Sequence, residues 1–175
     1  MSDALHQLNI TISNEEDRLL LRVSTTAKQE YRLWLTRRFV RALWGVLIKA
    51  VERQAGADVQ GDDEVRNALL SFQHEAAVKG ADFKTAYTAQ AFEAPFGEKP
   101  VLLVGAQLKA GRVGNFELTL QTIDERSVAV RLDAKLLHSF CSILSAAAKK
   151  ADWGLDLKIG APLGAAQTPE GAKVH

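Results

Sequence analysis

The strongest constraint on the fold is a strand–strand–helix pattern between Asp17 and Arg53. Hydrophobic and polar residues alternate along two short segments, 18–24 and 30–35, as they do in half-buried strands. After Thr36, a favourable N-cap residue, large apolar residues recur every three or four positions, as in an amphipathic helix. The stretch therefore predicts an antiparallel strand pair followed by a long helix.

The same pattern recurs between Gly114 and Lys150. A shift of 97 positions superposes the alternating strands and brings the predicted caps Thr36 and Asp133 together without a gap. A further strand precedes each copy of the pattern, at 8–13 and 101–110, and these two strands agree only after a one-residue slip. We interpret the recurrence as an internal repeat of two β-meander-plus-helix units. The alternative is that two amphipathic segments of common length align by chance.

These elements predict one α+β domain over residues 1–159, with antiparallel sheets packed against helices and a pseudo-two-fold repeat. Unit one covers about 8–54, a connecting helix covers 62–79, and unit two covers about 83–151. Residues 160–175 are expected to be a flexible tail, because they are rich in Gly, Ala and Pro.

Three details of this assignment are more local. Residues 82–93 alternate imperfectly and are interpreted as a strand, and residues 155–159 as a short edge strand. In the connecting helix, one apolar stripe is expected to face the core; it consists of Val65, Leu69, Phe72 and Ala76.

Composition and the absence of targeting signals bear on where the protein folds and works. A hydrophobic fraction of 47% in 175 residues is enough to bury a core without disulfide or metal support. The single cysteine, Cys141, cannot form an intramolecular disulfide, which favours a reducing compartment. Neither a signal peptide nor an apolar run of the roughly 20 residues that cross a bilayer is present. We therefore expect a cytoplasmic protein without a membrane partner.

Two resemblances to known proteins add to these predictions. The segment EYRLWLTRRFV, Glu30 to Val40, resembles one found in a family of uncharacterised bacterial proteins of similar length, and the likeness covers roughly residues 17–52. It implies no function. From Leu8 to Lys150, the order of elements resembles the PUR-alpha and Whirly architecture, in which repeats of several strands and a helix pair into one domain that binds single-stranded nucleic acid. That resemblance implies a single-stranded nucleic acid as the ligand.

The candidate interaction or nucleic-acid face is the outward side of the first unit and the start of its helix. Its residues are Arg18, Leu20, Arg22, Arg32, Trp34, Arg37, Arg38 and Arg41. Guanidinium groups pair with phosphates, and an indole can stack on a base or anchor a protein interface. The corresponding face of the second unit is nearly neutral, which favours one binding surface.

An alternative interpretation of this face needs no ligand. In it, Leu20 and Trp34 pack under another element or a partner chain. The arginines then pair with nearby acidic residues, namely Glu15, Glu16, Asp17 and Glu30.

The sequence contains no recognisable catalytic, cofactor-binding or metal-binding set. His138 and Cys141 lie at i and i+3 of the third predicted helix, but no third ligand of suitable spacing accompanies them. Cys141 also belongs to the apolar stripe, so a buried cysteine is expected, and His74 is expected to be isolated. No cofactor is predicted.

The favoured function is therefore a non-enzymatic interaction module that contacts a protein partner or its own copy, which would make it a homo-oligomer. The alternative is binding of single-stranded nucleic acid through the same face. An enzyme ranks third, because no acid–base constellation can be assembled from these residues.

Overall fold

The computed structural model describes residues 3–56, 63–80, 92–112 and 114–160. In these residues it contains six strands and three helices, an α+β arrangement as predicted. In chain order they are β1 (Asp3–Ser13), β2 (Arg18–Thr25), β3 (Glu30–Leu35), α1 (Arg37–Gln54), α2 (Asp63–Lys79), β4 (Val101–Ala110), β5 (Phe116–Thr122), β6 (Ser127–Leu132) and α3 (Ala134–Lys150).

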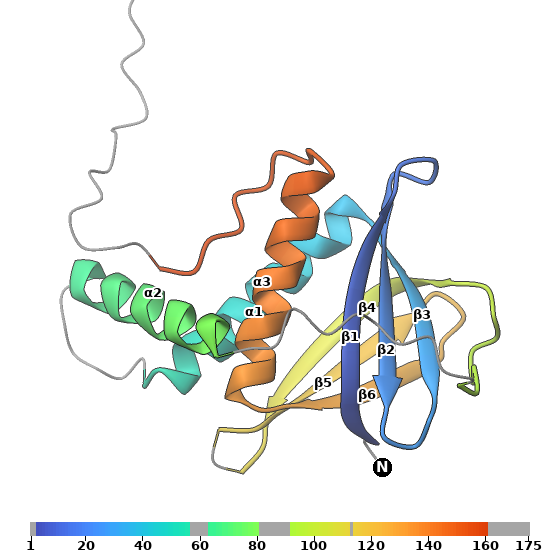
Figure 1. Cartoon of the computed structure of the whole chain (residues 1–175), viewed down its shortest axis with the longest axis horizontal. Helices are drawn as coiled ribbons and strands as arrows, with labels where there is room; N and C mark the ends of the chain where they lie inside the picture. The colour runs from blue at the N-terminus through green and yellow to red at the C-terminus, as the bar shows by residue number, and fades with distance from the viewer. Residues whose placement is uncertain (1–2, 57–62, 81–91, 113, 161–175) are drawn as a thin grey trace, which may run out of the picture.

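The strands form one closed barrel in the order β1 to β6 (Figure 1). Within each set of three, β1–β3 and β4–β6, neighbouring strands are antiparallel. The two sets meet through short parallel pairs, Leu33 with Val101 and Asp3 with Val130. The expectation of purely antiparallel sheets is thus wrong at these junctions. β3 connects to β4 through α1 and α2, and such a crossover allows the two strands to run parallel. β1 and β6 are not consecutive in the chain, so no short connection forces them to be antiparallel.

Corresponding strands of the two sets have matching register. In the first set Leu21 pairs with Leu33, and 97 positions later Leu118 pairs with Val130. The first strand of each set has an irregularity, between Leu5 and Gln7 in β1 and between Leu103 and Gly105 in β4, 98 positions apart. This offset of 98 positions is one more than the 97 that relates the other strands, and it agrees with the one-residue slip found in the sequence.

The hydrophobic core is built by the alternating strand residues together with α1 and α3. The inward residues of β2, β3, β5 and β6 are buried, as the alternation predicts. The apolar stripes of α1 and α3 join them, with Leu43, Leu47, Phe140 and Leu144 almost fully buried. One continuous cluster therefore includes both units.

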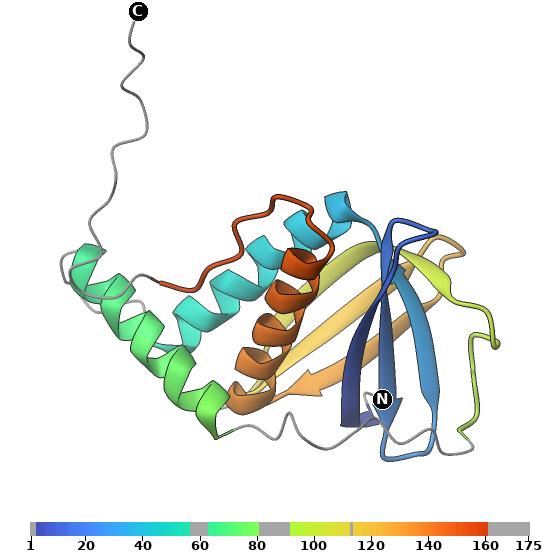
Figure 2. The ribbon, with the colours of Figure 1, turned by 45° about the horizontal axis from the view of Figure 1, so that its top comes forward.

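All three helices lie on the same side of the barrel (Figures 1 and 2). α1 and α3 begin as predicted, because Thr36 and Asp133 each accept a hydrogen bond from the amide three residues later. α1 packs on α3 and β4, α3 packs on β1, and α2 packs on α3. α1 therefore contacts β4 of the second unit, and α3 contacts β1 of the first unit.

Two local predictions are wrong. α2 exists, but its apolar stripe does not face the core: Val65 is 57% and Phe72 71% exposed, whereas Leu70 is buried. Residues 155–159 form no strand; they run as an irregular segment in which Ile159 is buried. The predicted strand at 82–93 falls almost wholly, and the tail after Gly160 wholly, outside the described residues.

Candidate functional site

The structure divides the predicted interaction face into two groups. The strand group lies on the outward side of β2 and β3 and is half-buried; it consists of Arg18, Leu20, Arg22, Arg32 and Trp34. The helix group lies in the first turns of α1 and is exposed; it consists of Arg37, Arg38 and Arg41. The two groups have different surroundings and are considered separately.

Side chains of the strand group face one another across the β2–β3 pair. Leu20 lies opposite Trp34, and Arg22 lies opposite Arg32. Two directly opposed cations destabilise a strand pair unless other groups neutralise them. The surroundings of these arginines therefore decide how much charge the face presents.

Acidic and carbonyl oxygens neutralise part of the strand group. Arg32 Nε lies 2.6 Å from the buried Glu30 carboxylate, and Arg32 Nη1 donates to the Glu98 carbonyl oxygen at 3.0 Å. Arg18 lies 3.9 Å from Glu16. These contacts agree with the alternative interpretation, in which the arginines pair with neighbouring acids.

The loop before β4 packs beside β3. The Phe96 ring lies edge-on to Tyr31, with 4.8 Å between ring centroids, and the Arg126 guanidinium lies 4.5 Å from the Phe96 centroid. Glu93 forms an isolated bridge with Gln29. These contacts anchor the loop on the core side of β3, and the loop reaches the strand group through the Glu98 carbonyl oxygen, which accepts from Arg32.

The helix group continues along α1 as a larger basic surface. We define the α1 basic face as Arg37, Arg38, Arg41, Lys49 and Arg53, all of which are exposed. At 3.6 residues per turn, the last four fall within about a third of the helix circumference and extend over about 22 Å. None of the five forms an ion pair with another described residue.

Folding alone does not explain the residues of this face. Arg37 and Arg38 lie in the first turn, where the positive end of the helix dipole disfavours cations, and no acidic residue accompanies them there. Gly45 lies mid-helix and is exposed, and a Cβ placed on it would meet no atom within 4 Å. Glycine at such a position costs about 0.5–1 kcal/mol relative to alanine.

A groove lies between α1 and β4, next to the basic face. It has a volume of about 350 Å³, and its floor is formed by small and aliphatic side chains, namely Val46, Ala50, Ala106 and Leu108. Lys49 and Arg53 line it from α1 and Lys109 from β4, together with Gln107. Its lining contains three cations and no acid.

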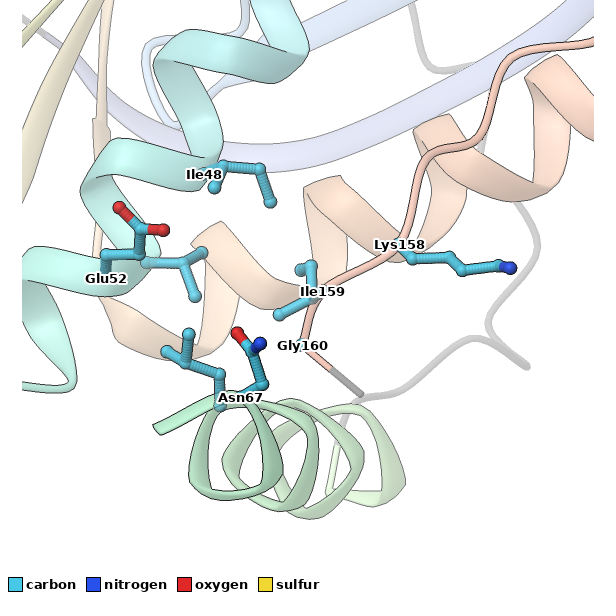
Figure 3. A pocket seen from close by; sticks show the side chains of 8 residues that line it. Ile48, Glu52, Asn67, Lys158, Ile159 and Gly160 are labelled. Carbon is cyan, nitrogen blue, oxygen red and sulfur yellow. The ribbon is translucent and has the colours of Figure 1, made fainter. Parts of the chain in front are cut away.

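A second pocket, of about 230 Å³, lies between α1, α2 and the segment after α3 (Figure 3). Ile48, Ile159 and Leu70 supply apolar walls, while Glu52 and Lys158 carry opposite charges. Gly160 closes one side at φ +63°. The lining is divided about equally between apolar and polar groups and its charges balance, which is typical of an imperfectly filled contact between elements.

A histidine pair joins the three helices. His138 on α3 is buried; its Nδ1 lies 3.0 Å from His74 Nδ1 on α2, and its Nε2 lies 3.0 Å from Gln54 Oε1 on α1. Burial, reinforced by His74, lowers the pKa of His138 to about 4. Burial also lowers the pKa of His74, and Glu75 partly opposes that shift.

One choice of tautomers satisfies both contacts of this pair. With Gln54 Oε1 as the acceptor, neutral His138 carries its proton on Nε2, and His74 donates from Nδ1 to His138 Nδ1. The prediction of an isolated His74 is therefore wrong. A sequence separation of 64 residues left no local signal of the contact.

Cys141 is buried, as predicted. Burial raises the pKa of its thiol to about 12, which keeps it protonated and unreactive at neutral pH. Within the described parts of the chain, no three His, Cys, Asp or Glu side chains converge on a point that could hold a metal ion. The described helices also include none that is long and apolar enough to cross a membrane.

Comparison of the chain with family models, curated proteins and solved structures finds no match. The geometry of the α1 basic face and its groove is therefore the basis for a functional proposal.

Proposed function

We propose that the protein is a non-enzymatic binding module whose α1 basic face holds single-stranded nucleic acid. One observation carries the proposal: five basic side chains are exposed along one helix, and none has an ion-pair partner among the described residues. A linear series of cations matches the repeating phosphates of a polyanion. The exposed Ala42 and Gly45 lie between the cations and leave room for a ligand backbone to approach.

The groove favours a single strand over a duplex. Its apolar floor beside Lys49, Arg53 and Lys109 suits a base whose phosphate pairs with the cations. Bases are available to such a floor only where the strand is unpaired. An acidic polypeptide would satisfy the cations but would leave the groove unused.

The strand group supports the competing proposal, a protein or self-association surface formed by Leu20 and Trp34. These two side chains are paired across β2 and β3 and only half-buried, so a partner could cover them further. The arginines around them already contact Glu16, Glu30 and Glu98. We therefore rank the α1 basic face first.

Binding of a fluorescent single-stranded oligonucleotide at several salt concentrations tests the proposal. Affinity should fall with salt, with a log–log slope of up to about −3.5 if all five cations contact phosphates. Arg41→Ala should weaken binding several-fold and make the slope about 0.7 less steep. Lys150→Ala is the matched control: it removes an exposed cation at the position of α3 that corresponds to Arg53, and should change neither.

Four outcomes would reject or redirect the proposal. Lack of binding at low salt would reject nucleic acid as the ligand. Equal loss with Arg41→Ala and Lys150→Ala would indicate general electrostatic attraction. A larger loss with Trp34→Ala than with Arg41→Ala would move the site to the strand group. Poly-glutamate that competes as well as the oligonucleotide would favour an acidic protein.

We further propose that the two units form a pseudo-two-fold repeat. The matching registers of β2–β3 and β5–β6 support this, as do the corresponding irregularities in β1 and β4. The reciprocal packing of α1 on β4 and α3 on β1 also supports it. An experimental structure in which the units fail to superpose would reject the repeat.

A further inference from the structure

The exposed side of α2 is the most apolar helical surface in the described structure. Val65, Leu69 and Phe72 are 57%, 38% and 71% exposed. With Ala76 they follow a spacing of four, three and four residues, which is the a/d spacing of a heptad. Phe72 and Val65 are the kind of side chains that protein interfaces cover.

This stripe is not used to hold α2 on the rest of the protein. The docked side carries Leu70, which is buried, and His74, which contacts His138. At 100° per residue these two lie on the opposite side of the helix from the stripe. The stripe is therefore a second contact surface.

We propose that the α2 stripe pairs with the same stripe of a second copy, in antiparallel orientation. A two-fold axis that passes between Leu70 and Ser71 places Leu69 of each copy against Phe72 of the other and Val65 against Ala76. Leu69 and Ala76 are a positions and Val65 and Phe72 are d positions, so every a position then faces a d position, as in an antiparallel coiled coil.

Charge decides between the two orientations. α2 has acidic residues, Asp63 and Glu64, in its first turn and Lys79 in its last. The antiparallel arrangement brings Lys79 near the acidic turn of the other copy and opposes the two helix dipoles, whereas a parallel pair would place like charges together. The C-terminal segment offers a poorer occupant, because residues 161–175 include only two large aliphatic residues, Leu163 and Val174.

The association is expected to be weak. The stripe spans only three helical turns, so its contact area falls well below the roughly 800 Å² per partner of a standard stable interface. We expect a monomer–dimer equilibrium in the micromolar range. Sedimentation velocity between about 1 and 200 µM should show it.

Phe72→Ser is the first test, because Phe72 is exposed and its replacement should leave the fold intact. The dimer dissociation constant should rise at least about tenfold. Ile123→Ser is the matched control, since Ile123 is 62% exposed and lies outside α2. A wild-type protein that stays monomeric at 200 µM would overturn the proposal, as would equal effects of the two substitutions.

Disulfide trapping tests the orientation. Val65→Cys and Ala76→Cys proteins are mixed and oxidised gently; Cys141 is buried and should not compete. The antiparallel arrangement predicts a disulfide between the two different variants. Crosslinks only within the Val65→Cys population would indicate a parallel pair, and a dimer without any crosslink would place the interface elsewhere. Either result would overturn the proposal.

Discussion

α1 and α3 start from similar caps and end at very different surfaces. Arg41 and His138 are each the fifth residue after the N-cap, yet Arg41 is exposed and His138 is buried beneath α2. Gly45 and Ser142 also correspond; Gly45 is exposed and Ser142 is half-buried. Where α2 covers it, α3 carries groups that tolerate burial, and its exposed cations lie near its ends, whereas the open face of α1 carries cations along its length.

The comparison separates residues that the fold requires from residues that it only permits. The apolar stripes of α1 and α3 serve the same core, so their similarity reflects packing. The outer faces differ because α2 packs on α3. Variants that change this covering, or the charge of the open face, should therefore affect the two helices unequally.

The largest effect is expected from Gly160→Ala. A Cβ at Gly160 would overlap the Asn67 carbonyl oxygen and lie 2.7 Å from the Ser71 amide nitrogen, both on α2. The clash should cost roughly 1–3 kcal/mol of the free energy that holds α2 in place. Hydrogen exchange should show faster exchange in α2 and no change in α1.

The control for that variant is Gly154→Ala. Gly154 has nearly the same positive φ, 62°, but a Cβ there meets nothing within 4 Å. It therefore measures the cost of the backbone conformation alone, about 1 kcal/mol. Equal effects of the two substitutions would contradict the proposed clash with α2.

The second largest effect is expected from acidification, which should weaken the docking of α2 on the rest of the protein. The folded-state pKa of His138, about 4, lies below its ordinary value of 6.5, and that of His74 is also lowered. Neutral imidazoles therefore stabilise docking above about pH 6.5, and this stability is lost as the pH falls toward 4. Among the described residues, Gln54 contacts His138 and the charge of Glu75 acts on His74.

Hydrogen exchange at pH 7 and pH 4.5, corrected for intrinsic rates, measures this effect. α2 should lose protection while α1 keeps it. His74→Gln removes one of the titrating groups and should reduce the difference. Protection of α2 that does not change with pH would show that the histidine pair does not control docking.

Gly45→Ala should stabilise α1 by about 0.5–1 kcal/mol, because alanine is the better helix former and has room there. Thermal or denaturant unfolding measures the change. Gly45→Leu should weaken oligonucleotide binding if the ligand approaches this part of α1. Binding unaffected by leucine would place the ligand away from the middle of the helix.

The smallest effects on stability are expected from Arg38→Glu and Lys135→Glu. These two variants should also differ most clearly in oligonucleotide binding. Both are exposed cations two residues after an N-cap, so each change should gain about 0.3–1 kcal/mol from the helix dipole. Only Arg38→Glu should reduce oligonucleotide binding. A similar loss with Lys135→Glu would end the functional distinction between α1 and α3.

Local patterns predicted the elements of both units well. Strand alternation identified the buried faces of β2, β3, β5 and β6, and the caps Thr36 and Asp133 located the helix starts. These features depend on neighbours within a few residues. The repeat and the nucleic-acid function stay proposals, because their support is geometric.

Features that depend on distant neighbours were missed. The apolar stripe of α2 suggested an inward face, but α2 docks through Leu70 and His74, and the partner of His74 is 64 residues away. The parallel junctions between β3 and β4 and between β1 and β6 have no local signature either. In the predicted interaction face, the pairing of Arg32 with Glu30 agrees with the alternative interpretation, whereas the hydrogen bond from Arg32 to the Glu98 carbonyl oxygen, 66 residues away, had no local signal.

The closure of the barrel has a consequence for how the chain reaches its folded state. Asp3 pairs with Val130, so the last junction joins segments almost at opposite ends of the described chain. Such long-range closure raises contact order and slows folding. At a synthesis rate of about 5–20 residues per second, several seconds or longer pass between the completion of β1–β3 and the completion of β4–β6. A nascent chain should therefore expose its strand edges to chaperones until α3 emerges.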